Sequence, residues 1–303
     1  MNEKWSAAPP RPASVVAAPV DWTWMAGQFR ASEWVVLLYF SYTAILAASF
    51  SVPPGRRLVS AAAPVLLFAL GAAGSRNPKR WTSIARDWLP AALVLGAYWQ
   101  LNWFQSPHRM VGLENLFLRF DETILTRMRL HQAIESMGPV IPTLLEAAYT
   151  LLYAIPPLSI AALYVYGRRS RVDRFLFPFL LGTLCAYALL PHFPTASPRF
   201  EFPALDLPSY ATSWRRLNEW ILGKGDIDTG VFPRGHVTAA FSAAFAMMRT
   251  LPEKPLVGRV LLVMAVLIAT ATVYGRYHYA ADAISGLGIS ILALGFSMMV
   301  RRD

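Results

Sequence analysis

The sequence has little charge and almost no cysteine. Asp, Glu, Lys and Arg make up 15% of its 303 residues, whereas about 25% is usual for a soluble globular domain. The single cysteine, Cys185, lies inside an apolar run, which excludes a disulfide scaffold and a thiolate metal cluster. Hydrophobic residues are 55% of the chain and the mean hydropathy is +0.38. This composition excludes a disordered chain and a soluble globular enzyme.

Long apolar runs recur between Glu33 and Val300. Several of them approach the roughly 18–20 residues that a helix needs to cross a bilayer. We therefore predict an all-α integral membrane protein, a polytopic helical bundle of about eight spans. The predicted spans are 33–52, 58–75, 88–105, 142–166, 175–191, 232–249, 259–275 and 282–300.

The spans form a single predicted membrane domain over 31–303, which follows a cytoplasmic tail at 1–30. A stripe of apolar residues beside charged ones in 106–141 predicts an amphipathic helix in the membrane interface. Residues 192–231 are rich in proline and aromatic residues and are predicted to form an extracytoplasmic loop, with a short helix around Leu217. The stripe consists of Leu113, Phe117, Phe120, Ile124 and Met128, beside Glu114, Arg119, Asp121 and Arg127.

Basic residues exceed acidic ones by 28 to 18, a net charge of +10. They occur in short groups between apolar runs, which is typical of membrane topology signals and not of a nucleic-acid-binding arm. With the amino terminus in the cytoplasm, 16 of the 28 lie in inner segments and 12 in outer ones. We expect both termini in the cytoplasm, a bacterial inner-membrane location and no nucleic-acid partner. The sequence gives no indication of a protein partner.

Three polar clusters stand at the ends of predicted spans. His236 follows Pro233 at the start of a helix of small residues, where free backbone N–H groups would point at an anion. His278 and Asp282 are four residues apart, so they share a helix face and the carboxylate can orient the imidazole. The third cluster is Pro191–Arg199.

The order of the spans brings all three clusters to one membrane face, which the charge count makes extracytoplasmic. Two histidines, a carboxylate and several arginines suit a phosphate. Arginines and helix amino termini would hold its oxygens, one histidine would attack phosphorus, and the other would protonate the leaving oxygen.

Phe-Pro-x-x-x-Pro-Arg at 193–199, Pro-x-x-His at 233–236 and Tyr-His-Tyr-x-x-Asp at 277–282 resemble the type-2 phosphatidic acid phosphatase superfamily. The resemblance is closest to the inositol phosphorylceramide synthase branch and covers about 142–300. It implies a six-helix phosphatase-like core and a lipid phosphatase or phosphotransferase acting through a phosphohistidine, with head-group transfer expected from that branch. The substrate would be a membrane lipid, with an alcohol or polyol as a possible acceptor.

The resemblance also implies residue roles. His278 would be the nucleophile, Asp282 its orienting group and His236 the general acid. Arg199 would bind phosphate, together with the backbone of Gly235.

Two positions depart from the phosphatase pattern. Arg234 stands where a serine is usual, and Thr272 stands where an arginine six residues before the nucleophile is usual; a Lys-x6-Arg-Pro element is also missing. We expect Arg234 or Arg276 to replace the lost phosphate ligand. Whether water or an alcohol accepts the phosphate stays open.

Other polar residues lie near the same face. Glu146 and Tyr149 share a helix face and could recognise a head group, or Glu146 could pair with a neighbouring arginine; Gln100 and Asn102 could add to the same pocket. His108 and His131 are expected to be structural, and His192 is undecided. Gly286 and Ser290 are expected to allow close helix packing.

Two alternatives stay open. A metal site built from the histidines and Asp282 is disfavoured because the arginines would repel a cation, so we expect no metal and no cofactor. A plain lipid phosphatase, or a lipid binder or transporter without catalysis, would use the same basic pocket.

Overall fold

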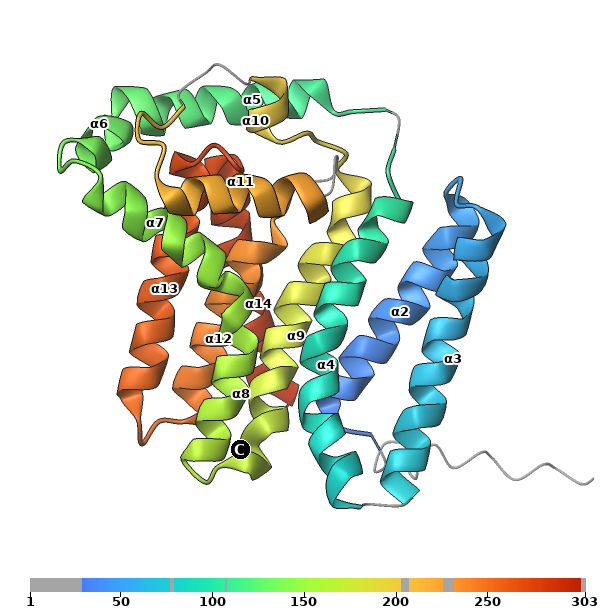
Figure 1. Ribbon diagram of the computed structural model, residues 1–303. Coiled ribbons are helices and arrows are strands. Elements are labelled where there is room, and N and C mark those ends of the chain that lie inside the picture. The colour runs from blue at the N-terminus through green and yellow to red at the C-terminus, as the bar shows by residue number, and fades with distance from the viewer. Residues whose placement is uncertain (1–28, 77–78, 107, 203–206, 226–231, 301–303) are drawn as a thin grey trace, which may run out of the picture.

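The computed structural model of the protein is a bundle of helices (Figure 1). Within the described part of the chain every regular element is a helix, as predicted. The described residues are 29–76, 79–106, 108–202, 207–225 and 232–300. Most of the predicted tail at 1–30 therefore lies outside them.

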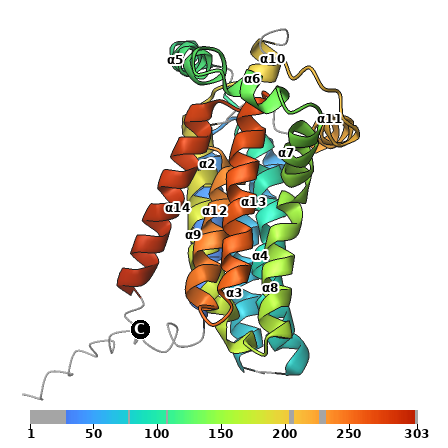
Figure 2. The same cartoon turned by 90° about the vertical axis from the view of Figure 1, so that its left-hand side faces the viewer.

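Long helices run roughly along one axis and pack side by side (Figures 1 and 2). Proline occupies the first turns of α8 and α13, where it has no backbone N–H to leave unpaired. The long helices are α2 (Ala31–Ser49), α3 (Pro54–Arg76), α4 (Arg80–Gln100), α7 (Val140–Leu151), α8 (Ile155–Val165), α9 (Val172–Leu189), α12 (Gly235–Thr250), α13 (Pro255–Tyr274) and α14 (Ala280–Val300). A short 3₁₀ turn, η3 (Leu152–Ala154), joins α7 to α8.

Of the eight predicted spans, six correspond to helices that are long and apolar enough to cross a membrane, counted over the described residues. The predicted spans at 88–105 and 232–249 differ. They correspond to α4, which carries Arg86 and Asp87 in its first half, and to α12, which has only 16 residues. Because α12 packs against α9, α13 and α14 and is mostly buried, it needs no apolar surface for lipid.

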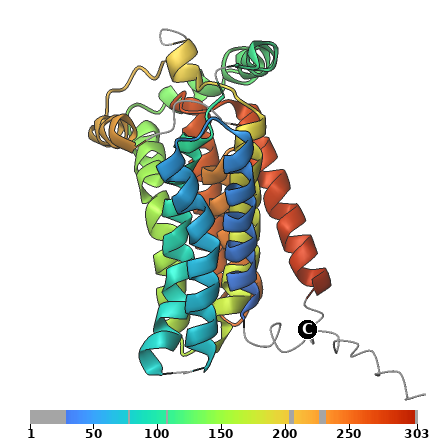
Figure 3. The same cartoon turned by 90° about the vertical axis from the view of Figure 1, so that its right-hand side faces the viewer.

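The outer helices carry the apolar surface of the bundle. On α3 only Ser60 is buried, while Leu58 and Val65 are more than half exposed. Figure 1 shows α2 and α3 at one side of the bundle, and Figure 3, in which they face the viewer, shows α14 leaning away from the bundle toward its carboxyl end. An apolar exterior of this kind is the surface that a membrane solvates.

Short elements lie across one end of the bundle (Figures 1 and 2). The amphipathic helix predicted in 106–141 is present as α5 (Val111–Glu122), the π-helical turn η2 (Thr123–Arg127) and α6 (Leu130–Glu135). The helix predicted around Leu217 is α11 (Ser213–Gly225), and α10 (Pro198–Glu201) precedes it.

The side of α5 that faces the protein carries two carboxylates. Its carboxylates Glu114 and Asp121 are buried, with 2% and 0% exposure, whereas Leu116 and Phe120 are 60% and 39% exposed. These two carboxylates therefore face the protein, where guanidinium and backbone N–H groups are their partners, whereas Arg119 and Glu122 are exposed. Part of the apolar side of α5 faces outward.

The opposite end of the bundle is tied together by Asp87, which is 2% exposed. Its carboxylate accepts from Arg30 at 2.6 Å and from Arg169 at 2.7 Å. The Tyr164 hydroxyl donates to it as well. This cluster joins α2, α4, α8 and the turn before α9 at a point remote from the histidines.

Close contact between α12 and α14 supports the predicted packing role of Gly286 and Ser290. A Cβ at Gly286 would lie 3.0–3.1 Å from atoms of Thr238 and Val237. The Ser290 hydroxyl donates to the backbone oxygen of Thr238 at 3.0 Å. The two helices thus meet backbone to backbone.

We predict that Gly286→Leu lowers the free energy of unfolding by about 1–3 kcal/mol, because the added atoms overfill this contact. Gly288→Leu is the matched control, since a Cβ there meets nothing within 4 Å. That control should stay within about 1 kcal/mol of the native protein, aided by the better helix propensity of leucine. Unfolding in detergent micelles measures both, and equal effects would contradict the packing assignment.

Candidate active site

The three predicted clusters meet at the end of the bundle that α5 and α10 cover. His236 lies in the first turn of α12, and His278 lies in the loop Gly275–Tyr279 that joins α13 to α14. The centroids of the two imidazole rings are 6.2 Å apart. Both side chains are buried, His236 at 5% and His278 at 1% exposure.

Asp282 lies in the first turn of α14 and is fully buried beside His278. Its Oδ2 is 3.7 Å from His278 Nδ1 and accepts the Tyr279 backbone N–H at 3.0 Å. The first distance is longer than a hydrogen bond, and catalytic hydrogen bonds often shorten only when substrate is bound. Since Nδ1 faces the carboxylate, Nε2 is the nitrogen available to an electrophile.

Neither ring nitrogen of His278 has a hydrogen-bond partner among the described residues. Buried polar atoms in native proteins are nearly always hydrogen-bonded. A buried imidazole without such bonds is therefore a group held ready for a ligand or for chemistry.

Arg234 is buried at 1% exposure and turns toward His236. Its Nε donates to His236 Nδ1 at 3.0 Å, and its Nη2 donates to the hydroxyl of Tyr98 at 3.4 Å. Because Nδ1 of His236 accepts a hydrogen bond, the neutral ring carries its proton on Nε2. A general acid at this position is the imidazolium form, which carries protons on both nitrogens, so the hydrogen bond from Arg234 belongs to the neutral ring and not to the acid form.

Three tyrosine rings surround His236. Their centroids lie 5.7 Å (Tyr98), 5.8 Å (Tyr149) and 6.0 Å (Tyr153) from that of the imidazole. Tyr149, predicted to contact a head group, also stacks on Tyr277 at 4.5 Å. Sequence reasoning missed Tyr98, which comes from α4, because nothing in the pattern of that helix sets it apart.

The surroundings of Gly235 leave no room for a side chain. A Cβ there would lie 2.1 Å from Cε1 of Tyr187. No side chain caps the amino terminus of α12, which begins at this residue. The backbone N–H groups of its first turn are therefore available to an anion, and phosphate binding by Gly235 stays a prediction.

The third cluster docks on the loop that carries His278. The Ser197 hydroxyl donates to the backbone oxygen of Tyr277 at 2.8 Å. Arg199 follows in α10, with its guanidinium 4.4 Å from the ring of Phe200. Its positive charge acts on His278, so the two lie in the same electrostatic environment.

Arg276 is oriented differently from Arg234. It has a left-handed backbone, with φ of 60°, and its buried guanidinium donates to Oδ2 of Asp121 at 2.6 Å. Oδ1 of Asp121 accepts the backbone N–H of Ala280 at 2.7 Å and so caps the start of α14. A phosphate contact by Arg276 stays a prediction, whereas Arg234 contacts His236.

Thr272 does not supply the positive charge that the usual arginine would bring to this position. It is fully buried, and its backbone oxygen accepts the His278 N–H at 3.0 Å. The position therefore shapes the loop, while the positive charge near the histidines comes from Arg234 and Arg199.

A second carboxylate of α5 contacts the Pro191–Arg199 cluster. Oε1 of Glu114 accepts the backbone N–H of Ala196 at 2.7 Å. Arg109 pairs with Glu114 and with Glu201. One helix thus holds both the segment before Arg199 and the segment around His278.

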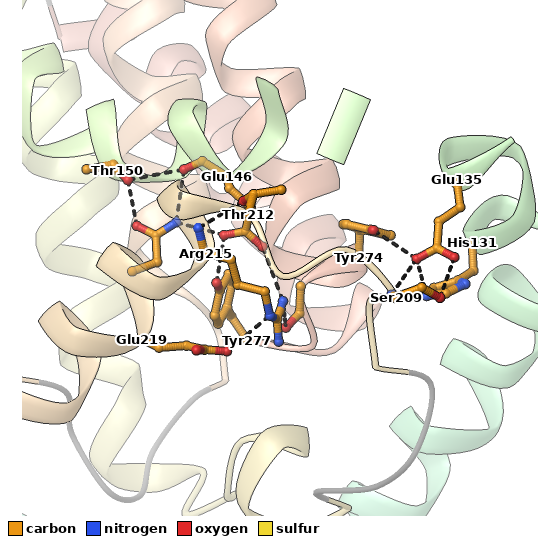
Figure 4. Close-up of polar contacts among 12 residues, drawn as sticks. His131, Glu135, Glu146, Thr150, Ser209, Thr212, Arg215, Glu219, Tyr274 and Tyr277 are labelled. Atoms are coloured by element: carbon orange, nitrogen blue, oxygen red, sulfur yellow. Dashed lines mark hydrogen bonds and ion pairs between the residues drawn. The ribbon is translucent and has the colours of Figure 1, made fainter. Parts of the chain in front are cut away.

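Glu146 lies in a buried network on the other side of the loop (Figure 4). Its carboxylate accepts from Arg215 at 3.2 Å, from Asn218 at 2.7 Å and from the hydroxyl of Tyr277 at 2.7 Å. Arg215 also donates to the backbone oxygen of Gly275 at 3.4 Å. Of the two interpretations of Glu146, the arginine pair is present, and recognition of a head group stays a prediction.

Gln100 and Asn102 are not brought to the histidines by their contacts. Gln100 donates to Ser60 of α3 at 3.1 Å, and Asn102 accepts from Gln105 at 3.1 Å. The prediction relied on their position near the end of a span, and the α-helix gives way there to the 3₁₀ helix η1 (Leu101–Trp103).

The remaining histidines have ordinary surroundings. His192 Nε2 is 2.6 Å from the hydroxyl of Tyr42, which also donates to the backbone oxygen of Ala188 at 2.8 Å. His131 lies 3.4 Å from Glu135, and His108 is exposed. Within the described residues no three His, Cys, Asp or Glu side chains converge on a common point, as a metal site requires.

Comparisons with known proteins agree on one family. The PAP2 superfamily model matches residues 115–296, a range that begins within α5. A PA-phosphatase-related-family protein of Dictyostelium discoideum is 38% identical over 65 residues, which are 22% of this chain and 11% of that protein. The chain thus aligns with only a small part of that relative. No solved structure matches the chain.

The pH dependence of activity should report the environment of His278. Its burial, with the positive charges of Arg234, His236 and Arg199, lowers the pKa of this imidazole well below the usual 6.5. The ring therefore stays unprotonated and nucleophilic at mildly acid pH, and the acid limb of kcat/KM should lie below pH 6.5. Arg234→Gln removes a nearby charge and should move that limb to higher pH.

Arg234→Lys is the matched control, because it keeps the positive charge and should leave the limb near its native position. The position of the limb, not the height of the profile, is the measurement. An unmoved limb in Arg234→Gln would contradict the electrostatic assignment.

Asp121 should matter for both stability and activity. Asp121→Asn leaves Arg276 buried without its charge partner, which typically lowers the free energy of unfolding by about 3–5 kcal/mol. The neighbouring Glu122→Gln, whose native side chain is 54% exposed, should change it by less than about 0.5 kcal/mol.

Adding Arg276→Gln to Asp121→Asn should restore part of the lost stability, since no unpaired charge remains. Chemical denaturation in micelles of the wild type, the two single variants and the double variant gives the coupling free energy. Additive effects of the two substitutions would show that the pair is unimportant.

Proposed function

The chain belongs to the PAP2 superfamily, and from that premise we propose that it transfers the phosphate group of a membrane lipid through a covalent intermediate on His278. The family membership and the apolar helices support a phosphatase-type enzyme embedded in a membrane. The observation that carries the finer proposal is the buried His278, with Asp282 at Nδ1 and His236 6.2 Å away.

In the first step the lone pair of His278 Nε2 forms a bond to phosphorus. The bond between phosphorus and the leaving oxygen breaks, and that oxygen takes the proton from Nε2 of His236. The donor is the imidazolium form of His236, which carries protons on both nitrogens and becomes a neutral ring when Nε2 gives up its proton. Asp282 stabilises the proton that stays on Nδ1 of His278.

In the second step an acceptor oxygen attacks phosphorus and loses its proton to Nε2 of His236. The bond from phosphorus to His278 breaks, and its electron pair returns to the nitrogen. Both histidines are then in their starting states, so the cycle balances without a cofactor. Arg234, Arg199 and the first N–H groups of α12 would neutralise the phosphate oxygens throughout.

We propose an alcohol as the acceptor, so that the reaction is head-group transfer of the inositol phosphorylceramide synthase type. The burial of both imidazoles supports this choice, because a closed site limits access of water to a reactive intermediate. The position of Arg234 in place of the usual serine supports it as well. The excess of basic residues in inner segments supports a site that opens on the extracytoplasmic side.

A trapping experiment tests the nucleophile. Wild-type protein is incubated with phosphatidic acid labelled with ³²P, or with phosphatidylinositol that carries ³²P in its phosphodiester. It should form an acid-labile, base-stable adduct. His278→Ala should form none, because no other group can take the phosphate. An undiminished adduct in His278→Ala would reject the assignment.

His236→Ala separates the general acid from the nucleophile. With a lipid alkoxide as leaving group it should slow the reaction by about 10²–10⁴-fold, whereas a p-nitrophenyl phosphate substrate needs no proton and should be spared. Product analysis with and without inositol or another polyol then identifies the acceptor. Free phosphate as the product under every condition would leave a plain phosphatase.

A further inference from the structure

A cavity of about 200 Å³ opens between α4 and α8. Its inner wall includes His236 and Tyr187, and its sides include Leu95, Leu152 and Phe179. It therefore leads from the side of the bundle to one of the two histidines at which the phosphate would react.

The walls of this cavity are apolar apart from the tyrosines and His236. Leu152 and Phe179 are buried, with 5% and 0% exposure. No Asp, Glu, Lys or Arg lines the cavity within the described residues. An apolar space of this kind excludes a charged or hydroxyl-rich group and accepts a hydrocarbon.

The mouth of the cavity lies on the apolar side of the bundle. Leu95 and Tyr153 at its edge are 45% and 42% exposed. The helix is interrupted at this edge, where η3 separates α7 from α8. Pro156 and Pro157 follow in the first turn of α8. Side chains exposed here would contact lipid and not water.

Tyr98 marks the boundary between the polar and apolar parts of the site. Its hydroxyl accepts from Arg234, and its ring lines the cavity. A molecule that fills both parts would have a negatively charged end at Arg234 and an apolar chain beyond Tyr98. That is the form of a phospholipid.

We propose that this cavity binds the hydrocarbon chain of the lipid substrate, which enters sideways between α4 and α8. The inference rests on the proposed function, because it takes the substrate to be a lipid whose phosphate lies between His236 and His278. An apolar cavity of roughly 150 Å³ holds one benzene molecule, so about 200 Å³ accommodates the first several carbons of one chain.

The cavity also assigns a role to a helix outside the matched family segment. Residues 115–296 match the PAP2 superfamily, whereas α4 ends at Gln100. Leu95 and Tyr98 therefore belong to a part of this chain that the family match does not cover. Chain-length preference should depend on residues of α4.

Leu95→Trp tests the site by narrowing its mouth. The substrates are dioleoyl and dibutyryl forms of phosphatidic acid and phosphatidylinositol, which share head groups and differ in chain length. For the dioleoyl substrate that wild type turns over, Leu95→Trp should lower kcat/KM at least tenfold. Its dibutyryl counterpart should change less than twofold.

Leu151→Trp is the matched control. Leu151 is 46% exposed, much as Leu95 is, but does not line the cavity. The control should change kcat/KM less than twofold with either chain length. Equal losses in Leu95→Trp for long and short chains, or the same long-chain loss in Leu151→Trp, would overturn the inference.

Photocrosslinking gives a readout that does not depend on turnover. Dioleoyl phosphatidic acid with a diazirine in one chain, near its ester, should label residues of α4 and α8, and Leu95→Trp should reduce that labelling severalfold. Labelling confined to other helices would overturn the inference. A wild-type protein that labels at α4 and α8 but forms no phosphoenzyme would instead reject the proposed function and leave the chain site in place.

Discussion

Asp121 joins the helix that crosses the end of the bundle to the loop that carries His278. One of its oxygens pairs with Arg276 and the other accepts the first N–H of α14, at Ala280. Both charged side chains are almost fully buried, and a buried charge is tolerated only where a partner and hydrogen bonds compensate it. These contacts hold the loop in the conformation in which His278 lies beside Asp282.

The same loop is held on its other side. Glu146 accepts from the hydroxyl of Tyr277, and Arg215 bridges Glu146 to the backbone of Gly275. Carboxylates from α5 and α7 thus fix the residues before and after His278, and neither needs to touch the phosphate to affect the reaction. Positioning of a reacting group within a fraction of an ångström is a large part of what such sites supply.

The molecule is divided into a polar end and an apolar body. Glu114, Asp121 and Glu146 gather basic and N–H groups at one end of the bundle, where the phosphate would react. The helices below are joined by apolar contacts and by backbone approach, as between α12 and α14. A lipid has the same division, and Tyr98 lies where the two parts meet.

Much of this arrangement follows from the sequence. Apolar runs of bilayer length predict the helices, and the four-residue spacing of His278 and Asp282 places them on one side of α14. Counting the spans brings both histidines to one end of the bundle, where the structure has them. These inferences succeed because they depend on local periodicity and on chain direction alone.

Only the tertiary structure decided which way the polar side chains turn. Arg234 and Arg276 each lie two residues before a histidine, yet one contacts His236 and the other contacts Asp121. Local periodicity predicts an amphipathic helix at α5, but it does not predict that Glu114 and Asp121 are buried against N–H and guanidinium groups. The rotation of each helix about its axis, set by partners distant in the chain, has no signature in local periodicity. For the same reason the place of Tyr98 beside His236 became visible only in the folded protein.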